Sequence, residues 1–139
     1  MTGLSRYIAT TPPPARKPRA GPRRKPEADL QKAVVKALRT AFPRWYVHGS
    51  LMGVNLGPRK GAEAKAMGCM PGYPDITLIS PSGGVCFLEL KTPEKNITES
   101  SLSEEQKVFR TNCKIWGIPY AVVNAPHTAI ETVRDWSWT

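Results

Sequence analysis

Two acidic side chains and one basic side chain fall on a predicted β-hairpin in the middle of the chain. Glu89 and Lys91 are two residues apart in the apolar run 85–91, so both side chains point to one face of a strand. Asp75 opens the preceding predicted strand, and the hairpin returns it toward Glu89. Because buried charges are costly unless they are paired or bind a metal ion, we expect these three groups to form a site.

Two carboxylates and an ammonium group at one end of a sheet suit phosphodiester hydrolysis. Mg²⁺ prefers oxygen ligands, and two carboxylates can hold it. The metal ion polarises the phosphate and lowers the pKa of a bound water molecule. A lysine beside that water orients it and balances the negative charge that develops. We therefore expect Mg²⁺ as the cofactor, with Mn²⁺ able to replace it.

The geometry of the hairpin sets a condition on this site. With a symmetric four-residue turn at 81–84, position 75 lies opposite position 90, and Asp75 points away from Glu89. The site thus requires an odd-length loop, a β-bulge, or an Asp75 that lies outside the strand. Two simpler interpretations remain open at this point: an exposed Glu89–Lys91 ion pair, and an Asp75 that serves only as a turn residue after Pro74.

The other predicted elements give a mixed α/β pattern. Pro26 or Glu27 is expected to begin a helix that runs to about Ala41, because proline suits the first helical position. Ser103 begins a capping-box sequence, which predicts a helix to about Trp116. We expect strands at 45–47, 74–79, 85–91 and 119–123, a short helix at 62–67 within a glycine-punctuated connection, and a last helix at 128–134.

The helix after Ser103 carries a glutamine on its predicted core-facing side. The apolar stripe consists of Leu102, Phe109, Cys113 and Trp116, and Gln106 falls within it. A buried amide needs hydrogen-bond partners. Gln106 either caps its own helix or reaches another group in the fold.

Cysteine usage and hydropathy restrict the class of protein. Cys69, Cys86 and Cys113 are far apart, odd in number and without a CxxC pair, which argues against a disulfide framework and against a zinc ribbon. We expect all three to be buried, in an intracellular protein of a reducing compartment. No apolar run approaches the roughly 20 residues that a membrane-spanning helix needs.

The positive charge is concentrated at the N-terminus. The chain has 139 residues and a net charge of +9, and residues 1–26 hold seven basic side chains, six prolines and no acidic side chain. Such a segment buries too little apolar surface to fold, so we expect a disordered basic arm at 1–26 and a folded domain at 27–139. The arm either follows a nucleic-acid backbone or is a solubilising tail.

Further basic side chains lie in the glycine-punctuated connection, where they either contact phosphates or face solvent. The candidate DNA-binding residues are Arg23, Arg24, Lys25, Arg59, Lys60 and Lys65.

Taken in order, these motifs resemble those of the virus-type replication-repair nuclease (VRR-NUC) domain of the PD-(D/E)xK nuclease superfamily. The resemblance covers Glu27 to Val123. It rests on Glu27 and Gln31 in the first helix, Gly72-Tyr73-Pro74-Asp75, the Glu89-Leu90-Lys91 strand, and Ser103-Glu104-Glu105-Gln106.

The resemblance implies a fold and a set of site residues. The fold is α/β and restriction-endonuclease-like, a mixed β-sheet flanked by helices with an αβββαβ core. The implied metal ligands are Asp75, Glu89 and the backbone carbonyl of Leu90. The implied catalytic residues are Asp75, Glu89, Lys91, Gln106 and Glu27.

The resemblance also implies a function. Standalone members are small phage and bacterial endonucleases that recognise DNA structure and tend to form homodimers. We therefore expect a Mg²⁺-dependent DNA endonuclease that resolves four-way (Holliday) junctions as a homodimer. Trp136 and Trp138 lie outside the resemblance and are either a dimer contact or, as is commoner for tryptophan, core residues. The alternatives are a restriction-like or flap endonuclease with the same catalytic set, and a non-catalytic DNA-binding protein. DNA is favoured over RNA because the sequence lacks an RNA-recognition signature with paired aromatic residues.

Overall fold

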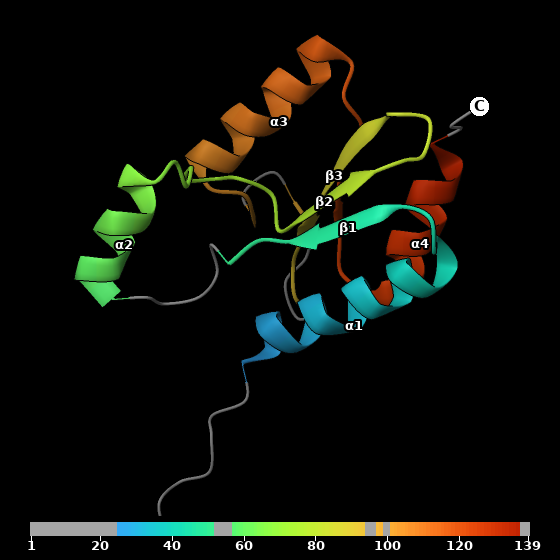
Figure 1. Cartoon of the computed structure of the whole chain (residues 1–139), viewed down its shortest axis with the longest axis horizontal. Helices are drawn as coiled ribbons and strands as arrows, with labels where there is room; N and C mark the ends of the chain where they lie inside the picture. The colour runs from blue at the N-terminus through green and yellow to red at the C-terminus, as the bar shows by residue number, and fades with distance from the viewer. Residues whose placement is uncertain (1–24, 52–56, 94–96, 99–100, 137–139) are drawn as a thin grey trace, which may run out of the picture.

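The structure is a computed structural model that describes residues 25–51, 57–93, 97–98 and 101–136. Figure 1 shows the arrangement of its helices and strands. The predicted arm lies almost entirely outside the described residues, so its disorder stays a prediction. The elements in chain order are α1 (Pro26–Ala41), β1 (Tyr46–Gly49), α2 (Gly57–Ala66), β2 (Ile76–Ile79), β3 (Val85–Leu90), α3 (Glu104–Trp116), β4 (Tyr120–Val123) and α4 (Pro126–Asp135).

The four strands form one mixed sheet in the order β1-β2-β3-β4. The first three strands are antiparallel to one another, and β4 runs parallel to β3. Helices α1 and α4 contact each other and cover one face, whereas α3 lies on the other side (Figure 1). The predicted mixed sheet flanked by helices is thereby confirmed, and the helices expected at 62–67 and 128–134 are present as α2, between β1 and β2, and α4, after β4.

The main hydrophobic core lies between the sheet and the α1–α4 pair. Proline occupies the first turn of both helices, where no intrahelical N–H bond is lost. Each helix then buries apolar side chains one turn apart on one face. They pack against alternate residues of β2 and β3. The buried cluster includes Val34, Leu38, Ile76, Leu78, Cys86, Leu88, Ala129 and Val133.

A second, aromatic contact joins the sheet to α3. Tyr73 lies edge-on to Phe87 of β3, with ring centroids 5.7 Å apart, and edge-on to Phe109 of α3 at 5.4 Å. Phe87 and Phe109 also meet edge-to-face at 5.0 Å. Such geometry is favourable for aromatic pairs. Because residues alternate along β3, Phe87 and Glu89 share this α3-facing side of the sheet.

The β2–β3 connection meets the condition that the site imposes. Five residues, Ser80 to Gly84, join the strands, and Ile76 pairs with Leu88. The Ser80 N–H donates to the Gly84 carbonyl at 2.8 Å, so the symmetric four-residue turn at 81–84 is wrong. Because Ser80 pairs with Gly84, the loop itself consists of the three residues 81–83. Its last residue, Gly83, has a φ of 87°, the left-handed conformation that such a loop requires at this position. Continued by one residue, this register places Asp75 beside Glu89.

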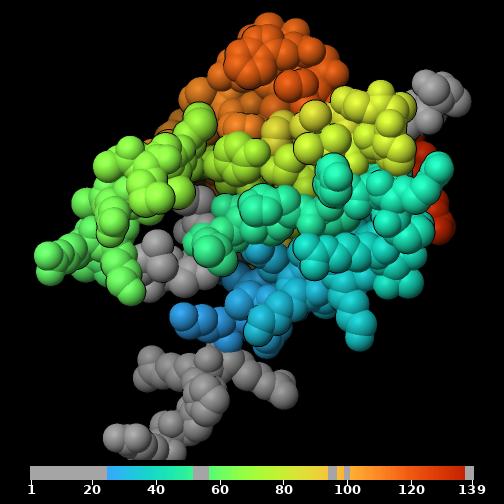
Figure 2. All heavy atoms as spheres, viewed as in Figure 1, coloured from blue at the N-terminus to red at the C-terminus, as the bar shows by residue number. Residues whose placement is uncertain are grey.

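Helix α2 is longer than predicted and stands away from the core. The glycine-punctuated connection was expected to hold a short helix at 62–67, but α2 begins at Gly57. None of its residues is buried, and it projects from one side of the molecule in Figure 2. Because α2 buries no side chain, its length leaves no mark in the apolar pattern of the sequence, and the predicted helix was too short.

Two predicted core residues are instead exposed. Trp116 is 69% exposed, because it occupies the last turn of α3 before the chain reverses at Gly117, whose φ is 72°. Of the other residues of that stripe, Leu102 and Cys113 are buried, and Phe109 is partly buried against Tyr73 and Phe87. Cys69 is exposed because it follows α2, away from the core, whereas Cys86 and Cys113 are buried as predicted. No helix among the described residues is long and apolar enough to span a membrane.

Candidate active site

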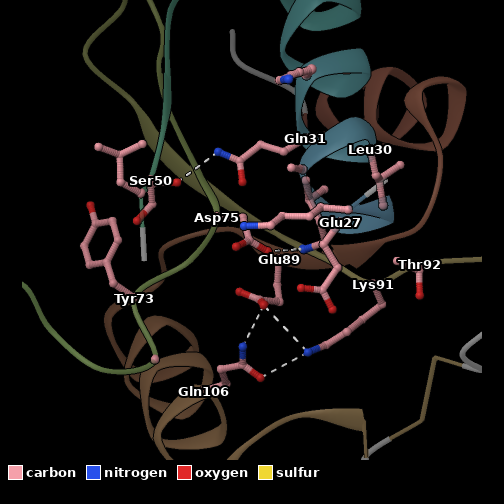
Figure 3. A pocket seen from close by; sticks show the side chains of 16 residues that line it. Glu27, Leu30, Gln31, Ser50, Tyr73, Asp75, Glu89, Lys91, Thr92 and Gln106 are labelled. Carbon is pink, nitrogen blue, oxygen red and sulfur yellow. Dashed lines mark hydrogen bonds and ion pairs between the residues drawn. The ribbon is translucent and has the colours of Figure 1, made fainter. Parts of the chain in front are cut away.

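Asp75 lies just outside β2, at the point where the chain enters the sheet. Its Oδ2 atom accepts a hydrogen bond of 2.8 Å from the backbone N–H of Leu90. Its own carbonyl accepts one of 2.7 Å from the N–H of Ser50. Asp75 thus lies in a bend after a buried proline, one position outside β2, but it does not serve only as a turn residue. Its carboxylate points into the same site as Glu89 (Figure 3).

Glu89 is the most buried charged residue of the site, at 3% exposure. Its Oε1 atom accepts a hydrogen bond of 2.7 Å from Nε2 of Gln106. Its Oε2 atom is also buried, but among the described residues it receives no hydrogen bond. A buried carboxylate oxygen without a donor is costly and indicates an unfilled partner position.

Lys91 completes the cluster from the end of β3. Its Nζ atom lies 3.8 Å from Oε1 of Glu89 and 3.3 Å from Oε1 of Gln106. The side chains of Lys91 and Glu89 are only 15% and 4% exposed. The interpretation as an ion pair on an exposed strand face is therefore wrong.

Gln106 makes both of the contacts that its position on α3 allowed. It caps its own helix, because its Oε1 atom accepts from the N–H of Ser103 at 2.9 Å and its N–H donates to Ser103 Oγ at 3.2 Å. Its side-chain amide simultaneously joins Glu89 and Lys91. The capping box of α3 is thus part of the site. Figure 3 shows the contacts of the Gln106 amide with Glu89 and Lys91.

Helix α1 forms the opposite wall of a cavity of about 480 Å³ that opens beside these groups. Glu27 and Gln31, one turn apart, both line it. Nε2 of Gln31 donates to the Ser50 carbonyl at 3.0 Å, and this contact ties α1 to the backbone that holds Asp75. Glu27 is exposed, and its charge contributes to raising the pKa of Asp75.

Asp75 and Glu89 shift each other's pKa in opposite directions: Asp75 raises the pKa of Glu89, whereas its contact with Glu89 lowers the pKa of Asp75. Burial is the main cause that raises the pKa of Asp75 above its usual range. Burial, followed by repulsion from Asp75, raises the pKa of Glu89 to about 8. Lys91 acts in the opposite direction on both groups. One ammonium group therefore offsets only part of the cost of burying two carboxylates together.

These residues fit a divalent cation. The available ligand atoms are hard oxygens, two carboxylates are close together, and Oε2 of Glu89 accepts no hydrogen bond from the part of the chain that the structure describes. No group of three His, Cys, Asp or Glu side chains suited to a metal ion occurs within the described ranges. Mg²⁺ is nonetheless commonly held by one or two carboxylates together with water and substrate phosphates. Leu90 lines the cavity, and its carbonyl stays a predicted third ligand.

The predicted DNA contacts fall into three groups. Arg59, Lys60 and Lys65 lie on the exposed helix α2. Lys25 precedes α1 and lines the cavity, whereas Arg23 and Arg24 lie outside the described residues.

The candidate dimer contact at the C-terminus receives no support. Trp136 packs against the hydrophobic core, and Trp138 lies outside the described residues.

The structure adds site residues that sequence reasoning had not assigned a role. Gly72, Ser50 and Lys32 all line the cavity. Gly72 carried a signal, since it begins the Gly-x-Pro-Asp sequence. Ser50 carried none, because it acts through its backbone. Lys32 follows Gln31 directly but falls among other lysines of α1, with nothing to distinguish it.

The comparisons with known proteins bear on the fold. Neither a family model nor a curated protein matches the sequence. A solved structure described as a VRR_NUC domain matches with a TM-score of 0.52 at 16% sequence identity, covering 82% of this chain and 100% of that one. The chain therefore has the fold of a VRR_NUC domain, as the motifs indicated.

Proposed function

We propose that this chain, which has the fold of a VRR_NUC domain, is a metal-dependent nuclease that hydrolyses phosphodiester bonds in DNA. One observation carries the proposal: Asp75, Glu89, Lys91 and Gln106 converge in one cavity, and a buried oxygen of Glu89 there lacks a donor among the described residues. Such a cluster is unfavourable for stability by itself, so its presence indicates a function.

The carboxylates of Asp75 and Glu89, with the Leu90 carbonyl, would hold Mg²⁺ or Mn²⁺. The cation, when bound, supplies Lewis-acid polarisation of the phosphate and a water of lowered pKa. Asp75 keeps its orientation through the Leu90 N–H, and Glu89 through the Gln106 amide. The protein therefore holds its ligands in place before a metal ion arrives.

Lys91 is the residue to which we assign the orientation of the nucleophile, which is a water molecule. Its ammonium group has three N–H donors and is held beside Gln106 and Glu89. An N–H of Lys91 can orient the attacking water and stabilise charge on the phosphate in the transition state. Gln106 keeps the amine and the carboxylate in fixed relative positions. Glu27 adds a further carboxylate at the rim of the cavity, where it would act through water.

For the substrate, we propose branched DNA, with the four-way junction cut by a homodimer. The net charge of +9 favours a polyanion. Two sites related by a two-fold axis are the arrangement needed to cut two opposing strands of a junction. The charge of the chain and its resemblance to standalone VRR-NUC domains support this proposal.

The test is a cleavage assay on end-labelled DNA. A four-way junction, a flap, a linear duplex and a single strand are each incubated with Mg²⁺, Mn²⁺ or EDTA, alongside the Lys91→Met variant. We expect paired symmetric cuts in the junction that disappear with EDTA and in the variant. Cuts confined to the flap or the duplex would retain the nuclease and overturn junction specificity. Binding without cleavage of any substrate would contradict the nuclease and favour a non-catalytic DNA-binding protein.

A further inference from the structure

Gly72 lies against the first turn of α3 more closely than any side chain would permit. Its φ is 77°, and a Cβ atom built there would lie 2.5 Å from the backbone carbon of Glu105 and 2.8 Å from the backbone nitrogen of Gln106. Real Cβ atoms essentially never approach other atoms below 3.0 Å. Because the opposing atoms are backbone, they cannot rotate away as a flexible side chain could. Glycine is needed here for close approach as well as for conformation.

This combination sets Gly72 apart from the other described glycines. Gly57, Gly68, Gly83 and Gly117 also have positive φ, but a Cβ on any of them would meet nothing within 4 Å. A Cβ on Gly49 would come within 2.8 Å only of Nε2 of Gln31, the flexible end of a side chain. Among these glycines, therefore, only Gly72 packs directly against the backbone of a helix.

The residue that Gly72 touches is the one that reaches into the site. The Gln106 N–H against which Gly72 packs donates to Ser103 Oγ at 3.2 Å. The side chain of the same residue bridges Glu89 and Lys91. A shift of this helical turn would displace the amide from Oε1 of Glu89.

The segment that begins at Gly72 also holds Asp75. Tyr73 lies edge-on to Phe109 of α3, and Pro74 is fully buried. Four consecutive residues thus carry one carboxylate of the site and the packing surface for α3. Figure 3 shows Tyr73, Asp75 and Gln106 around the same cavity.

We propose that Gly72 is a positioning residue, whose close packing on the first turn of α3 sets the place of the Gln106 side-chain amide relative to Glu89. The inference rests on the proposed nuclease function for its catalytic consequence, and on geometry alone for the position of the amide. Any side chain at position 72 pushes the turn outward and releases both Glu89 and Lys91 from Gln106.

The first experiment measures the amide directly. The two side-chain N–H signals of Gln106 in the ¹⁵N–¹H NMR spectrum are assigned by their loss in Gln106→Ala. In Gly72→Ala we expect them to move to the position of a solvent-exposed glutamine. Gly117→Ala is the matched control, since its φ of 72° is similar, it caps the other end of α3, and the space beside it is open. Both variants should melt at lower temperature, because alanine is strained at positive φ.

Two NMR outcomes overturn the proposal. If the Gln106 signals stay unchanged in a folded Gly72→Ala protein, the packing does not position the amide. If they move equally in Gly117→Ala, general loosening of α3 explains the effect. Should Gly72→Ala fail to fold, Tyr73→Leu loosens the adjacent contact of the same segment with Phe109 of α3 without a backbone change, and an unmoved amide there overturns the proposal that this segment positions it.

The second experiment measures cleavage at saturating DNA. We expect kcat to fall about tenfold in Gly72→Ala, with KM little changed, since the affected interaction is one that orients the reacting groups. The double variant Gly72→Ala/Gln106→Ala should be no slower than Gln106→Ala alone, because both changes act through one amide. Multiplying effects would contradict this coupling. If the unmodified protein cuts no DNA, the nuclease proposal fails, and the NMR result still decides the role of Gly72.

Discussion

Lys91 is the residue of the site that we expect to act on the attacking water and the phosphate rather than to bind the metal ion. Lys91→Met keeps the apolar stem and removes the charge. We expect single-turnover cleavage to fall by about a hundredfold or more, as is typical when one donor to a transition-state charge is removed. Mn²⁺ binding, measured by calorimetry, should change by only a few-fold, because both carboxylate ligands remain and a bound cation itself favours their ionised forms.

Lys107→Met is the matched control for this variant. Lys107 is also on the α3 side of the molecule, but its Nζ pairs with Glu104 at 3.1 Å in an exposed contact away from the cavity. Exposed ion pairs contribute little to stability. Equal cleavage by Lys91→Met and Lys107→Met would contradict the role of Lys91.

The pair Asp75–Glu89 predicts how stability depends on pH. The pKa of Glu89 is about 8 in the folded protein, against an ordinary value of 4.5. Between these values the folded state binds a proton that the unfolded state has released, so the free energy of unfolding falls as pH rises. Without metal, the melting temperature should therefore decrease from about pH 5.5 to about pH 8.5 more steeply than in Glu89→Gln.

Metal binding should oppose this fall in melting temperature, because a cation binds the ionised carboxylates and offsets their repulsion. Mg²⁺ should raise the melting temperature more at about pH 8.5 than at about pH 5.5, since protons compete with it at the lower pH. Differential scanning calorimetry with and without Mg²⁺ measures both effects. A Mg²⁺-induced shift that is the same in Glu89→Gln would rule out Glu89 as a ligand.

At the scale of elements, the capping box of α3 links helix stability to the site. Ser103→Ala removes the hydroxyl that accepts from the Gln106 N–H. We expect the free energy of unfolding to fall by about 1 kcal/mol, the usual cost of removing such a cap. Cleavage should slow as well, because Gln106 also holds Glu89. Ser103→Gly, which is tolerated at this position, should lose less stability.

Ser101→Ala controls for the removal of a serine hydroxyl near α3. The Ser101 hydroxyl donates to the Thr98 carbonyl at 2.6 Å in an exposed turn, without contact to Gln106. Denaturant unfolding and cleavage rates are measured for all three variants. Full cleavage activity in a destabilised Ser103→Ala protein would separate the cap from the site and contradict the link.

Helix α2 carries charge without carrying core residues. The triple change of Arg59, Lys60 and Lys65 to glutamine should leave the melting temperature nearly unchanged, since no residue of α2 is buried. DNA binding should weaken, and the dependence of log K on log salt should become shallower. The double change of Lys114 and Arg134 to glutamine, on α3 and α4, is the control. If both variants bind alike, α2 is not a specific DNA contact.

At the scale of the whole molecule, most of the excess charge lies in the first 24 residues. They contain six of the 20 basic residues and no acidic residue, so the rest of the chain carries 14 basic and 11 acidic residues, or +3. Deletion of residues 1–24 should reduce the salt dependence of DNA binding by about 0.9 for each phosphate that these residues neutralise. Binding titrations at several salt concentrations measure the slope, and an unchanged slope would show that this segment does not bind DNA.

The sequence by itself determined which residue types could act and which elements carry them. Alternation in β3 placed Glu89 and Lys91 on one side, and Pro26 and Ser103 marked the starts of α1 and α3 within a residue. These features are local, since strand alternation, proline geometry and helix capping depend on neighbours within a few residues. The order of the motifs along the chain resembles that of the VRR-NUC domain, and the fold agrees with this resemblance.

Only the tertiary structure decided what those residues meet. The register of β2 and β3 depends on a loop closed by Ser80 and Gly84, and the sequence allowed a different turn. The double role of Gln106 and the close approach of Gly72 depend on where α3 lands on the sheet, which is a contact between distant segments. The exposure of Trp116 and Cys69 has the same origin, because burial requires a neighbour that local pattern does not specify.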